Sequence, residues 1–342
     1  MTAKTTAAAT KSSKTAKGKT SSKAKKGSTS KKAASKAPAT PRYDTYQAVT
    51  DRICAALEGG QIPWRKGWNA AYGMPRNYVT GAAYQSVNAF LLAYAPFEYP
   101  IFMTYKQAQA LGGNVRKGEH GQKVIYASTV EGKEVEGKKA DDYYFLKEYT
   151  VFNIAQIDGI DFVLPEKIER VFTPNQAAEV LSQKYLNQPG APTLAHGGSV
   201  ACYFPESDHI QMPMRITFRS EQAYYRTLFH ELGHSTGATK RLNRSDLVNS
   251  GGKGSPSYAR EELTAEMTTA FLNAELGYAP EPEGDQHASY VQNWLTALRN
   301  DKTLVVKAAR QAQKAAYLIK GEEAPSHEIQ APAEVQELQL AA

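Results

Sequence analysis

The stretch His230-Glu231-Leu232-Gly233-His234 decides how the C-terminal half of this chain is interpreted. The residues before it follow the apolar spacing of an amphipathic helix, and Ser220 is a suitable N-cap for that helix. Positions i and i+4 of a helix share one face, so the two imidazoles can bind one metal ion. The carboxylate of Glu231 would lie beside the open coordination position, where it can take a proton from water. The stretch therefore predicts a zinc site with Glu231 as its catalytic base.

A third ligand is expected on the next predicted helix, residues 257–276, where Glu262 and Glu266 stand one turn apart. Two histidines and one carboxylate leave a coordination position open, whereas a structural zinc takes four protein ligands. The spacing resembles the E-x-x-x-D/E arrangement of the gluzincin peptidases, in which the first acid binds the metal. We expect Glu262 to be the ligand and Glu266 to orient a ligand histidine through its other ring nitrogen. The reversed assignment stays open, and Glu261 is expected to be solvated.

A hairpin is predicted over residues 199–217, just before the metal-binding helix. The segment 209–214 is expected to be the edge strand that holds an extended peptide by strand addition. His196 and His209 could reach the site as hydrogen-bond donors, and an ordinary polar role for each stays open as well.

Charge is distributed unevenly along the 342 residues. Residues 1–41 contain eleven lysines and no acidic residue, and residues 321–342 contain five glutamates and no lysine or arginine. Residues 42–320 are therefore close to neutral, with 30 basic and 29 acidic residues. Both tails are expected to be disordered, and the basic tail is either a solvated arm or an arm that binds phosphate groups.

Several protein classes are excluded by what the sequence lacks. No apolar run approaches the roughly 18 residues of a membrane span, and no apolar segment follows the N-terminal lysines as in a signal peptide. Two cysteines, Cys54 and Cys202, fit a reduced compartment and exclude a disulfide scaffold. The chain is expected to be cytoplasmic, with no membrane partner.

The periodicity predicts an α+β fold in two domains, residues 42–165 and residues 172–320. In the first domain, helices are expected near residues 44–57, 87–94 and 105–111, and strands near residues 123–127 and 143–153. In the second domain, helices are expected near residues 175–185, 288–298 and 303–319, in addition to the two helices of the metal site.

Aromatic and basic residues alternate in the first domain, and a second basic cluster follows. Bases stack on aromatic rings while Lys and Arg contact phosphates, so this pattern is typical of single-stranded nucleic-acid binding. The same aromatic residues would serve equally well as a hydrophobic core. The candidate DNA contacts are Trp64, Arg65, Lys66, Trp68, Arg76, Asn77, Tyr84, Arg116 and Lys117.

Residues 42–320 resemble the ArdC family of antirestriction proteins. The resemblance rests on motifs in both domains, including Pro63-Trp64, Thr104-Tyr105-Lys106-Gln107-Ala108, Gly112-Gly113-Asn114-Val115-Arg116-Lys117-Gly118-Glu119, His230 to Gly237, Arg241-Leu242-Asn243-Arg244 and Tyr258 to Glu266. It implies an N-terminal single-stranded-DNA-binding domain and a C-terminal zincin-like metallopeptidase domain of the gluzincin type. It also implies that the protein protects incoming plasmid DNA from host restriction during conjugation. The lysine-rich tail is a departure from the family pattern.

Three functions remain open at this point. The first is an antirestriction protein with an active zinc peptidase, whose protein substrate the sequence does not indicate. The second is a DNA-binding protein that protects by occlusion and carries a structural or vestigial zinc. The third is a peptidase whose N-terminal domain recognises protein. The intact Glu231 favours an active site, because a structural zinc has no use for a base beside it.

Overall fold

The computed structural model describes residues 44–64, 72–93, 95–130, 134–135, 138–139, 143–164, 174–252, 254–278 and 287–324. The basic tail, the acidic tail beyond residue 324 and the predicted domain junction at 165–173 lie outside these ranges. Within the described ranges, no helix is long and apolar enough to cross a membrane.

The described elements alternate between helices and strands in the N-terminal part and are mostly helical in the C-terminal part. In chain order they are α1 (Thr45–Glu58), β1 (Arg76–Asn77), α2 (Val87–Ala93), β2 (Ile101–Thr104), α3 (Tyr105–Ala110), β3 (Asn114–Val115), β4 (Gln122–Val130), β5 (Glu134–Val135), β6 (Lys138–Lys139), β7 (Tyr143–Asn153), a 3-10 turn (Ile154–Gln156), β8 (Ile157–Asp158), α4 (Pro174–Leu186), β9 (Thr193–His196), β10 (Cys202–Phe204), β11 (His209–Met212), a second 3-10 turn (Arg215–Thr217), α5 (Glu221–Ser235), α6 (Ser245–Val248), α7 (Pro256–Leu276), α8 (His287–Asn300) and α9 (Leu304–Lys320). The predicted α+β class and the predicted helices are confirmed.

Local sequence accounts for where the two helices of the metal site begin and end. The hydroxyl of Ser220 accepts a hydrogen bond from the backbone N–H of Ala223, which caps α5. Ser255 caps α7 in the same way through the N–H of Tyr258, and Pro256 stands in the first turn, where its missing N–H costs nothing. Gly277 ends α7 in the left-handed conformation, at φ 68°, which glycine adopts without strain.

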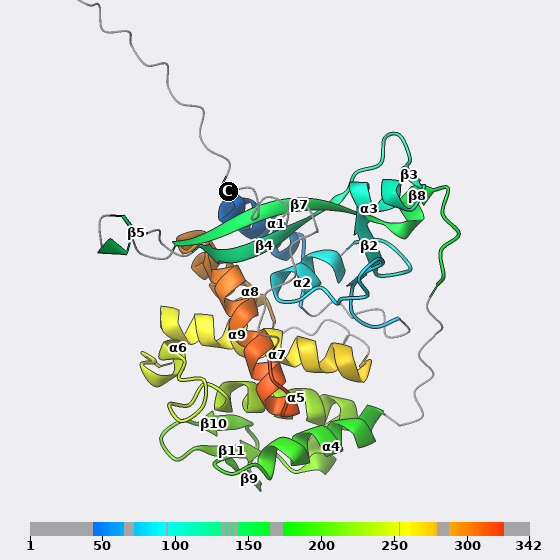
Figure 1. The fold of residues 1–342 in the computed structure, drawn as a ribbon. Helices are drawn as coiled ribbons and strands as arrows, with labels where there is room; N and C mark the ends of the chain where they lie inside the picture. The colour runs from blue at the N-terminus through cyan, green and yellow to red at the C-terminus, as the bar shows by residue number, and fades with distance from the viewer. Residues whose placement is uncertain are drawn as a thin grey trace, which may run out of the picture. The chain divides into compact units, whose positions relative to one another are not determined.

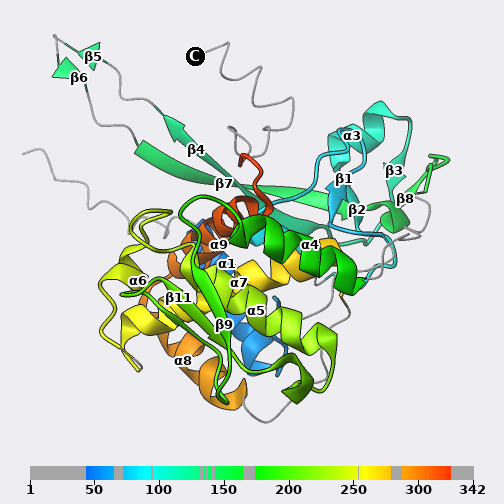
Figure 2. The same cartoon turned by 90° about the horizontal axis from the view of Figure 1, so that it is seen from below.

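A four-stranded sheet with the order β1-β2-β7-β4 forms the frame of the N-terminal part. The β4–β7 pair is a long antiparallel hairpin, and Figure 2 shows that it extends beyond the helices. β2 pairs antiparallel with β7 and parallel with β1. The sequence did not predict β1 or β2, because strands of two and four residues are too short to show a periodic pattern.

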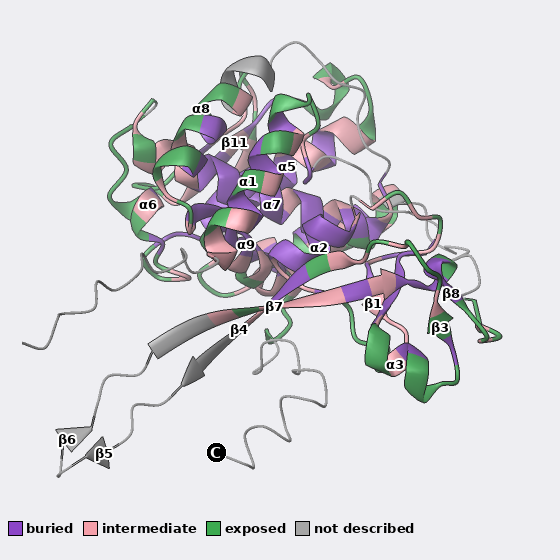
Figure 3. Cartoon of the chain, turned by 90° about the horizontal axis from the view of Figure 1, so that it is seen from above, coloured by how far each residue is buried: buried purple, intermediate pink, exposed green. Residues whose placement is uncertain are grey.

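The helices α5, α7 and α9 lie between this hairpin and a small sheet with the order β10-β11-β9 (Figure 1). Buried residues concentrate on these helices and on α2, as the purple segments of Figure 3 show. The largest fully buried side chains include Trp294, Tyr185, Tyr224, Phe90 and Phe229. The metal-site helices are therefore held rigidly inside the core rather than on its surface.

One hydrophobic cluster continues from α1 and α2 into the C-terminal helices. Polar contacts follow the same junction: the Thr50 hydroxyl donates to the Lys302 carbonyl at 2.8 Å, and the Gln85 amide donates to the Tyr317 hydroxyl at 3.3 Å. The boundaries predicted near residues 165 and 172 stay a prediction. The shared core means that residues 42–165 alone would expose apolar faces of α1 and α2 to water.

Candidate metal centre

Helix α5 presents His230 and His234 on one face, one turn apart. Their Nε2 atoms lie 3.1 Å apart and their rings are nearly perpendicular, at 84°. Both nitrogens therefore point towards the same small volume.

Helix α7 packs against α5 and brings Glu262 to that volume. Gly233, between the two histidines, makes the approach close: a Cβ there would lie 3.4 Å from the Cα of Ala265 and 3.4 Å from the Cβ of Thr268. The two carboxylate oxygens of Glu262 lie 3.4 Å from the Nε2 of His230 and 3.4 Å from the Nε2 of His234. One ligand atom from each of the three residues lies within 4.8 Å of the others.

This donor set fits a divalent metal ion. Two imidazole nitrogens and one carboxylate are the ligands of a catalytic zinc site with an open position. The three side chains that the sequence predicted as ligands, His230, His234 and Glu262, are those that converge in the structure.

The three ligand side chains influence one another's ionisation. Burial lowers the pKa of His234, but hydrogen bonds and charges from Glu261 and Glu262 outweigh burial and raise that pKa to about 10. The pKa of His230 is also raised, because Glu262 outweighs burial there. Burial raises the pKa of Glu262, but contacts with both imidazoles bring it well below its usual range. A divalent cation would compete with protons for the two imidazoles, because a histidine binds metal through a deprotonated ring nitrogen.

Glu231 is buried beside the ligands, with 7 % of its surface exposed. Its Oε2 accepts a hydrogen bond of 2.7 Å from the backbone N–H of Tyr203, in strand β10. The carboxylate is thereby held between the metal-site helix and the edge of the small sheet.

The expectation that Glu261 is solvated is wrong. Glu261 is 3 % exposed, and its Oε1 lies 3.1 Å from the Nδ1 of His234. Glu266 was expected to contact the second ring nitrogen of a ligand histidine, and at His234 that nitrogen is contacted by Glu261. Glu266 is half-buried, and its role in orienting a ligand histidine stays a prediction.

The predicted hairpin is present, but the expected edge strand is misplaced. β11, which contains His209 to Met212, lies between β10 and β9, so β10 and β9 are the edges. The error arose because the parallel partner β9 pairs across a connection that no local pattern reveals. One ring nitrogen of each histidine already has a partner: the Nε2 of His196 lies 2.8 Å from the Tyr224 hydroxyl, and the Nδ1 of His209 lies 2.8 Å from the Thr193 hydroxyl.

Comparison with known proteins agrees with this geometry. Residues 43–152 match the family described as the N-terminal domain of anti-restriction factor ArdC, and residues 182–311 match a zincin-like metallopeptidase family. The metal-free crystal structure of antirestriction protein ArdC from plasmid R388 is 38% identical and superposes with a TM-score of 0.65, covering 82% of this chain and 100% of that one. The chain belongs to the ArdC family.

Other relatives place this ArdC-family chain in a wider group. An uncharacterized protein, y4eC of Sinorhizobium fredii (strain NBRC 101917 / NGR234), is 38% identical over 301 residues, which are 82% of this chain and 92% of that protein. The DNA primase TraC of Escherichia coli is 35% identical over 294 residues, but these are only 20% of its length. A second R388 ArdC structure, described as Mn(II)-bound, is 40% identical, has a TM-score of 0.64, and covers 83% of this chain and 100% of that one. The zincin-like domain and this relative together indicate a divalent metal.

The structure contradicts a DNA-stacking role for Trp64 and Tyr84 in the ArdC-type N-terminal domain. Trp64 is 3 % exposed, with its ring edge-on to Trp294 of α8 at 5.2 Å, and Tyr84 is 6 % exposed. Both rings belong to the hydrophobic core, and a buried ring face leaves no room for a stacked base.

The other predicted DNA contacts differ in their surroundings. Arg65, Lys66 and Trp68 lie outside the described residues. Asn77 organises its own turn, since its side-chain oxygen accepts from the backbone N–H groups of Val79 and Thr80, and Arg76 beside it is half-buried in β1.

Arg116 and Lys117 are exposed. Arg116 forms ion pairs with Glu119 at 2.9 Å and with Asp158 at 3.2 Å, which offset its charge towards a phosphate. Contact of these residues with DNA stays a prediction.

Sequence reasoning missed two arginines that form ion pairs near the site, of which only Arg244 reaches a ligand histidine through its partner. Arg244 contacts Glu261, and Arg241 contacts Asp208 and the hydroxyl of Tyr203. Both arginines belong to the motif Arg241-Leu242-Asn243-Arg244, which carried the family resemblance without suggesting a role. Their position directly after the metal-site helix was the available signal.

Proposed function

We propose that this ArdC-family chain is an antirestriction protein that binds single-stranded DNA and carries a zinc-dependent peptidase centre, protecting incoming plasmid DNA from host restriction. The observation that carries the enzymatic part is the convergence of His230, His234 and Glu262, with the carboxylate of Glu231 beside them. A structural zinc would take a fourth protein ligand, and this group offers three among the described residues.

A divalent metal bound by the three ligands would polarise a peptide carbonyl and acidify a water molecule. Glu231 is placed to accept the proton of the attacking water and to return it to the leaving amine nitrogen. The N–H of Tyr203 steadies that carboxylate while it changes its charge. The nearby edge strand β10 is suited to align an extended peptide.

The test compares Glu231→Gln with the wild type in metal content, in cleavage of a peptide library and in protection of transferred plasmid DNA. The glutamine keeps an oxygen for the Tyr203 N–H but cannot take a proton, so we expect normal metal content and no cleavage. Glu275→Gln, at an exposed carboxylate of α7 that pairs with Lys320, is the matched control. Undiminished cleavage by Glu231→Gln would refute the mechanism, and lost cleavage with full protection would show that protection rests on DNA binding alone.

For the DNA-binding part, we propose the face of the β4–β7 hairpin that contains Tyr126, Lys147 and Tyr149. Tyr126 pairs with Lys147 across the strands and Val124 pairs with Tyr149, so these side chains share one face of the sheet. Tyr126 and Tyr149 are half-buried, and their ring centroids lie 6.4 Å apart. Lys147 is exposed, and its ammonium nitrogen lies 5.2 Å from the centroid of the Tyr149 ring. Two rings beside a cation are the elements that bind bases and phosphates.

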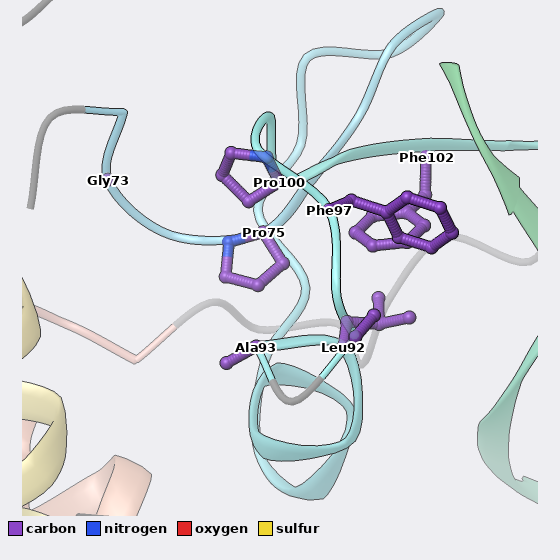
Figure 4. Close-up of a pocket in the computed structure, with 8 residues that line it drawn as sticks. Gly73, Pro75, Leu92, Ala93, Phe97, Pro100 and Phe102 are labelled. Carbon is purple, nitrogen blue, oxygen red and sulfur yellow. The ribbon is translucent and has the colours of Figure 1, made fainter. Parts of the chain in front are cut away.

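A small pocket lies near the end of α2 and strand β2 in the same part of the chain. It is lined by Pro75, Pro100, Phe97 and Phe102, together with Gly73, Leu92, Ala93 and Ala95 (Figure 4). Phe97, which lines the pocket, and Tyr149 pack against the same hydrophobic cluster. The side chains that line it are apolar and offer no base-specific contact, in agreement with binding that has little sequence preference.

Titrations of the full chain with single-stranded and duplex DNA test this surface. Replacing a stacked ring by alanine costs roughly 1–3 kcal/mol per base, so Tyr126→Ala should weaken single-strand binding about five- to 150-fold. Tyr105→Ala, at an exposed tyrosine of α3, is the matched control and should leave the affinity unchanged. Equal affinities for wild type and Tyr126→Ala would remove the hairpin from the DNA-binding surface.

A further inference from the structure

Behind His234, on the side away from the other ligands, lies a buried ion pair between Glu261 and Arg244. The Nε of Arg244 donates to Glu261 Oε2 at 2.9 Å and an Nη2 hydrogen is donated to Oε1 at 2.5 Å, a bidentate arrangement. Glu261 is 3 % exposed and Arg244 5 % exposed. The same Oε1 faces the Nδ1 of His234 at 3.1 Å, which makes a continuous chain from guanidinium to carboxylate to imidazole.

Arg244 also holds the backbone of the metal-site helix. Its Nη2 donates to the carbonyls of Gly233 at 2.8 Å and His234 at 3.3 Å, and its Nη1 donates to the hydroxyl of Thr236 at 2.6 Å. The guanidinium therefore adds to the hydrogen bonds at the end of α5, where the Gly233 carbonyl also accepts from the Thr236 hydroxyl at 2.6 Å and the His234 carbonyl from the Gly237 N–H at 2.8 Å.

Room for this guanidinium depends on Gly237. A Cβ at Gly237 would lie 2.8 Å from both the Cζ and the Nη2 of Arg244, closer than real atoms approach. Gly237, two residues beyond α5, is therefore needed to leave space for the Arg244 side chain and not to adopt an unusual backbone angle.

We propose that Glu261 and Arg244 are positioning residues for the metal centre, acting through His234. The carboxylate accepts the Nδ1–H of His234, which selects the tautomer whose Nε2 is free to bind a metal and fixes the ring orientation. Arg244 holds that carboxylate in place and supplies the charge that lets it stay ionised while buried. The inference rests on the metal centre proposed above.

If the Arg244–Glu261 pair only stabilised the fold, its loss would not change metal affinity. The Arg241–Asp208 pair provides a comparison, because it does not contact a ligand histidine. Arg241, in the same loop, pairs with Asp208 and donates to the carbonyl of Ser235 at 2.7 Å. It too is a buried arginine, with 8 % of its side chain exposed, but its carboxylate partner contacts the tyrosine hydroxyl of Tyr203 and the ammonium of Lys240. Loss of either arginine should destabilise the fold, whereas only loss of the Arg244–Glu261 pair should weaken metal binding.

Calorimetric titration of the full chain with Zn²⁺ and with Mn²⁺ tests this. Glu261→Gln preserves shape and packing, and we expect it to weaken metal binding roughly 10- to 100-fold, the usual effect of removing such a partner. Arg244→Lys should weaken binding in the same direction, while Arg241→Lys should lower the unfolding temperature and leave the affinity within about twofold of wild type. Thermal unfolding of each variant establishes that the titrated protein is folded, and Glu261→Asp takes the place of Glu261→Gln if the glutamine variant does not fold.

The outcomes distinguish the positioning role of Glu261 and Arg244 from the metal centre on which it rests. A wild-type protein that binds neither metal would overturn the metal centre itself. A wild type that binds metal and a folded Glu261→Gln with the same affinity would overturn the positioning role alone. Equal weakening in Arg241→Lys and Arg244→Lys would also overturn it, because the effect would then reflect general loosening of the loop.

Discussion

Replacing Trp64 by alanine should destabilise the protein without changing the DNA affinity of the folded molecules. The ring is 3 % exposed and packs edge-on against Trp294, which is 1 % exposed, at a centroid distance of 5.2 Å. Truncating a buried tryptophan to alanine costs about 3–5 kcal/mol, and the lost aromatic pair adds roughly 0.5–1.5 kcal/mol. The pair joins α8 to the segment after α1, so the loss falls where the N-terminal and C-terminal parts share their core.

Each kcal/mol lowers the unfolding temperature by roughly 2–4 °C in domains of 150–250 residues, so a decrease on the order of 10 °C is expected. Scanning calorimetry and urea unfolding measure the loss of stability, and titration with single-stranded DNA well below the transition measures binding. Trp64→Phe restores most of the packed volume, and the Trp64 Nε1 has no hydrogen-bond partner among the described residues that the change would remove. Trp64→Phe should therefore be clearly more stable than Trp64→Ala. A stable Trp64→Ala protein with lost DNA affinity would refute this reasoning and return Trp64 to the DNA-binding surface.

Three further predictions concern the metal centre and the basic tail. Because the pKa of His234 is raised to about 10, its imidazolium stabilises the metal-free protein fully below the ordinary histidine pKa, and this contribution is lost as pH rises through 10. Metal must displace that proton, so the apparent affinity should tighten by about tenfold per pH unit for each proton released between pH 7 and 9, and a pH-independent titration would contradict this. Gly237→Ala should lower the unfolding temperature and weaken metal binding, because the added Cβ would displace Arg244. Gly252→Ala is the control: its Cβ meets nothing within 4 Å, but the φ of +79° is strained for alanine, so it should lower stability without changing metal affinity. Deleting residues 1–41 should flatten the dependence of DNA affinity on salt concentration, since fewer phosphates would be neutralised, and equal slopes would show that the tail is a solvated arm.

The metal-site helices were predictable from the sequence because they depend on short-range relations. The i, i+4 spacing of His230 and His234 places both rings on one face of any helix that contains them, and Ser220 and Gly277 mark helix ends through their own local geometry. The long hairpin strands β4 and β7 were equally visible, since aromatic and branched residues recur along them.

Tertiary packing alone decided the role of each acidic residue of α7. Glu261, Glu262 and Glu266 lie on neighbouring turns, and their spacing permits more than one of them to face α5. The rotation of α7 about its axis settles the matter: Ala265 and Thr268 pack against Gly233, which directs Glu262 to both Nε2 atoms and Glu261 to the opposite side of His234. Arg244 pairs with Glu261 and so offsets the free-energy cost of burying that carboxylate.

The same division explains the aromatic residues of the N-terminal domain. An alternation of rings and cations is compatible with a stacking surface and with a core, because periodicity reports which residues share a face but not what covers that face. Trp64 is covered by Trp294, a residue from the far end of the chain, while Tyr126 and Tyr149 stay partly open on a hairpin that extends past the helices. The sequence by itself determined the helices, their ends and the facing histidines, since these follow from neighbours a few residues apart. Which carboxylate orients the metal ligand, which ring is buried and which strand is the edge were decided by contacts between segments distant in the chain, and no local pattern encodes those contacts.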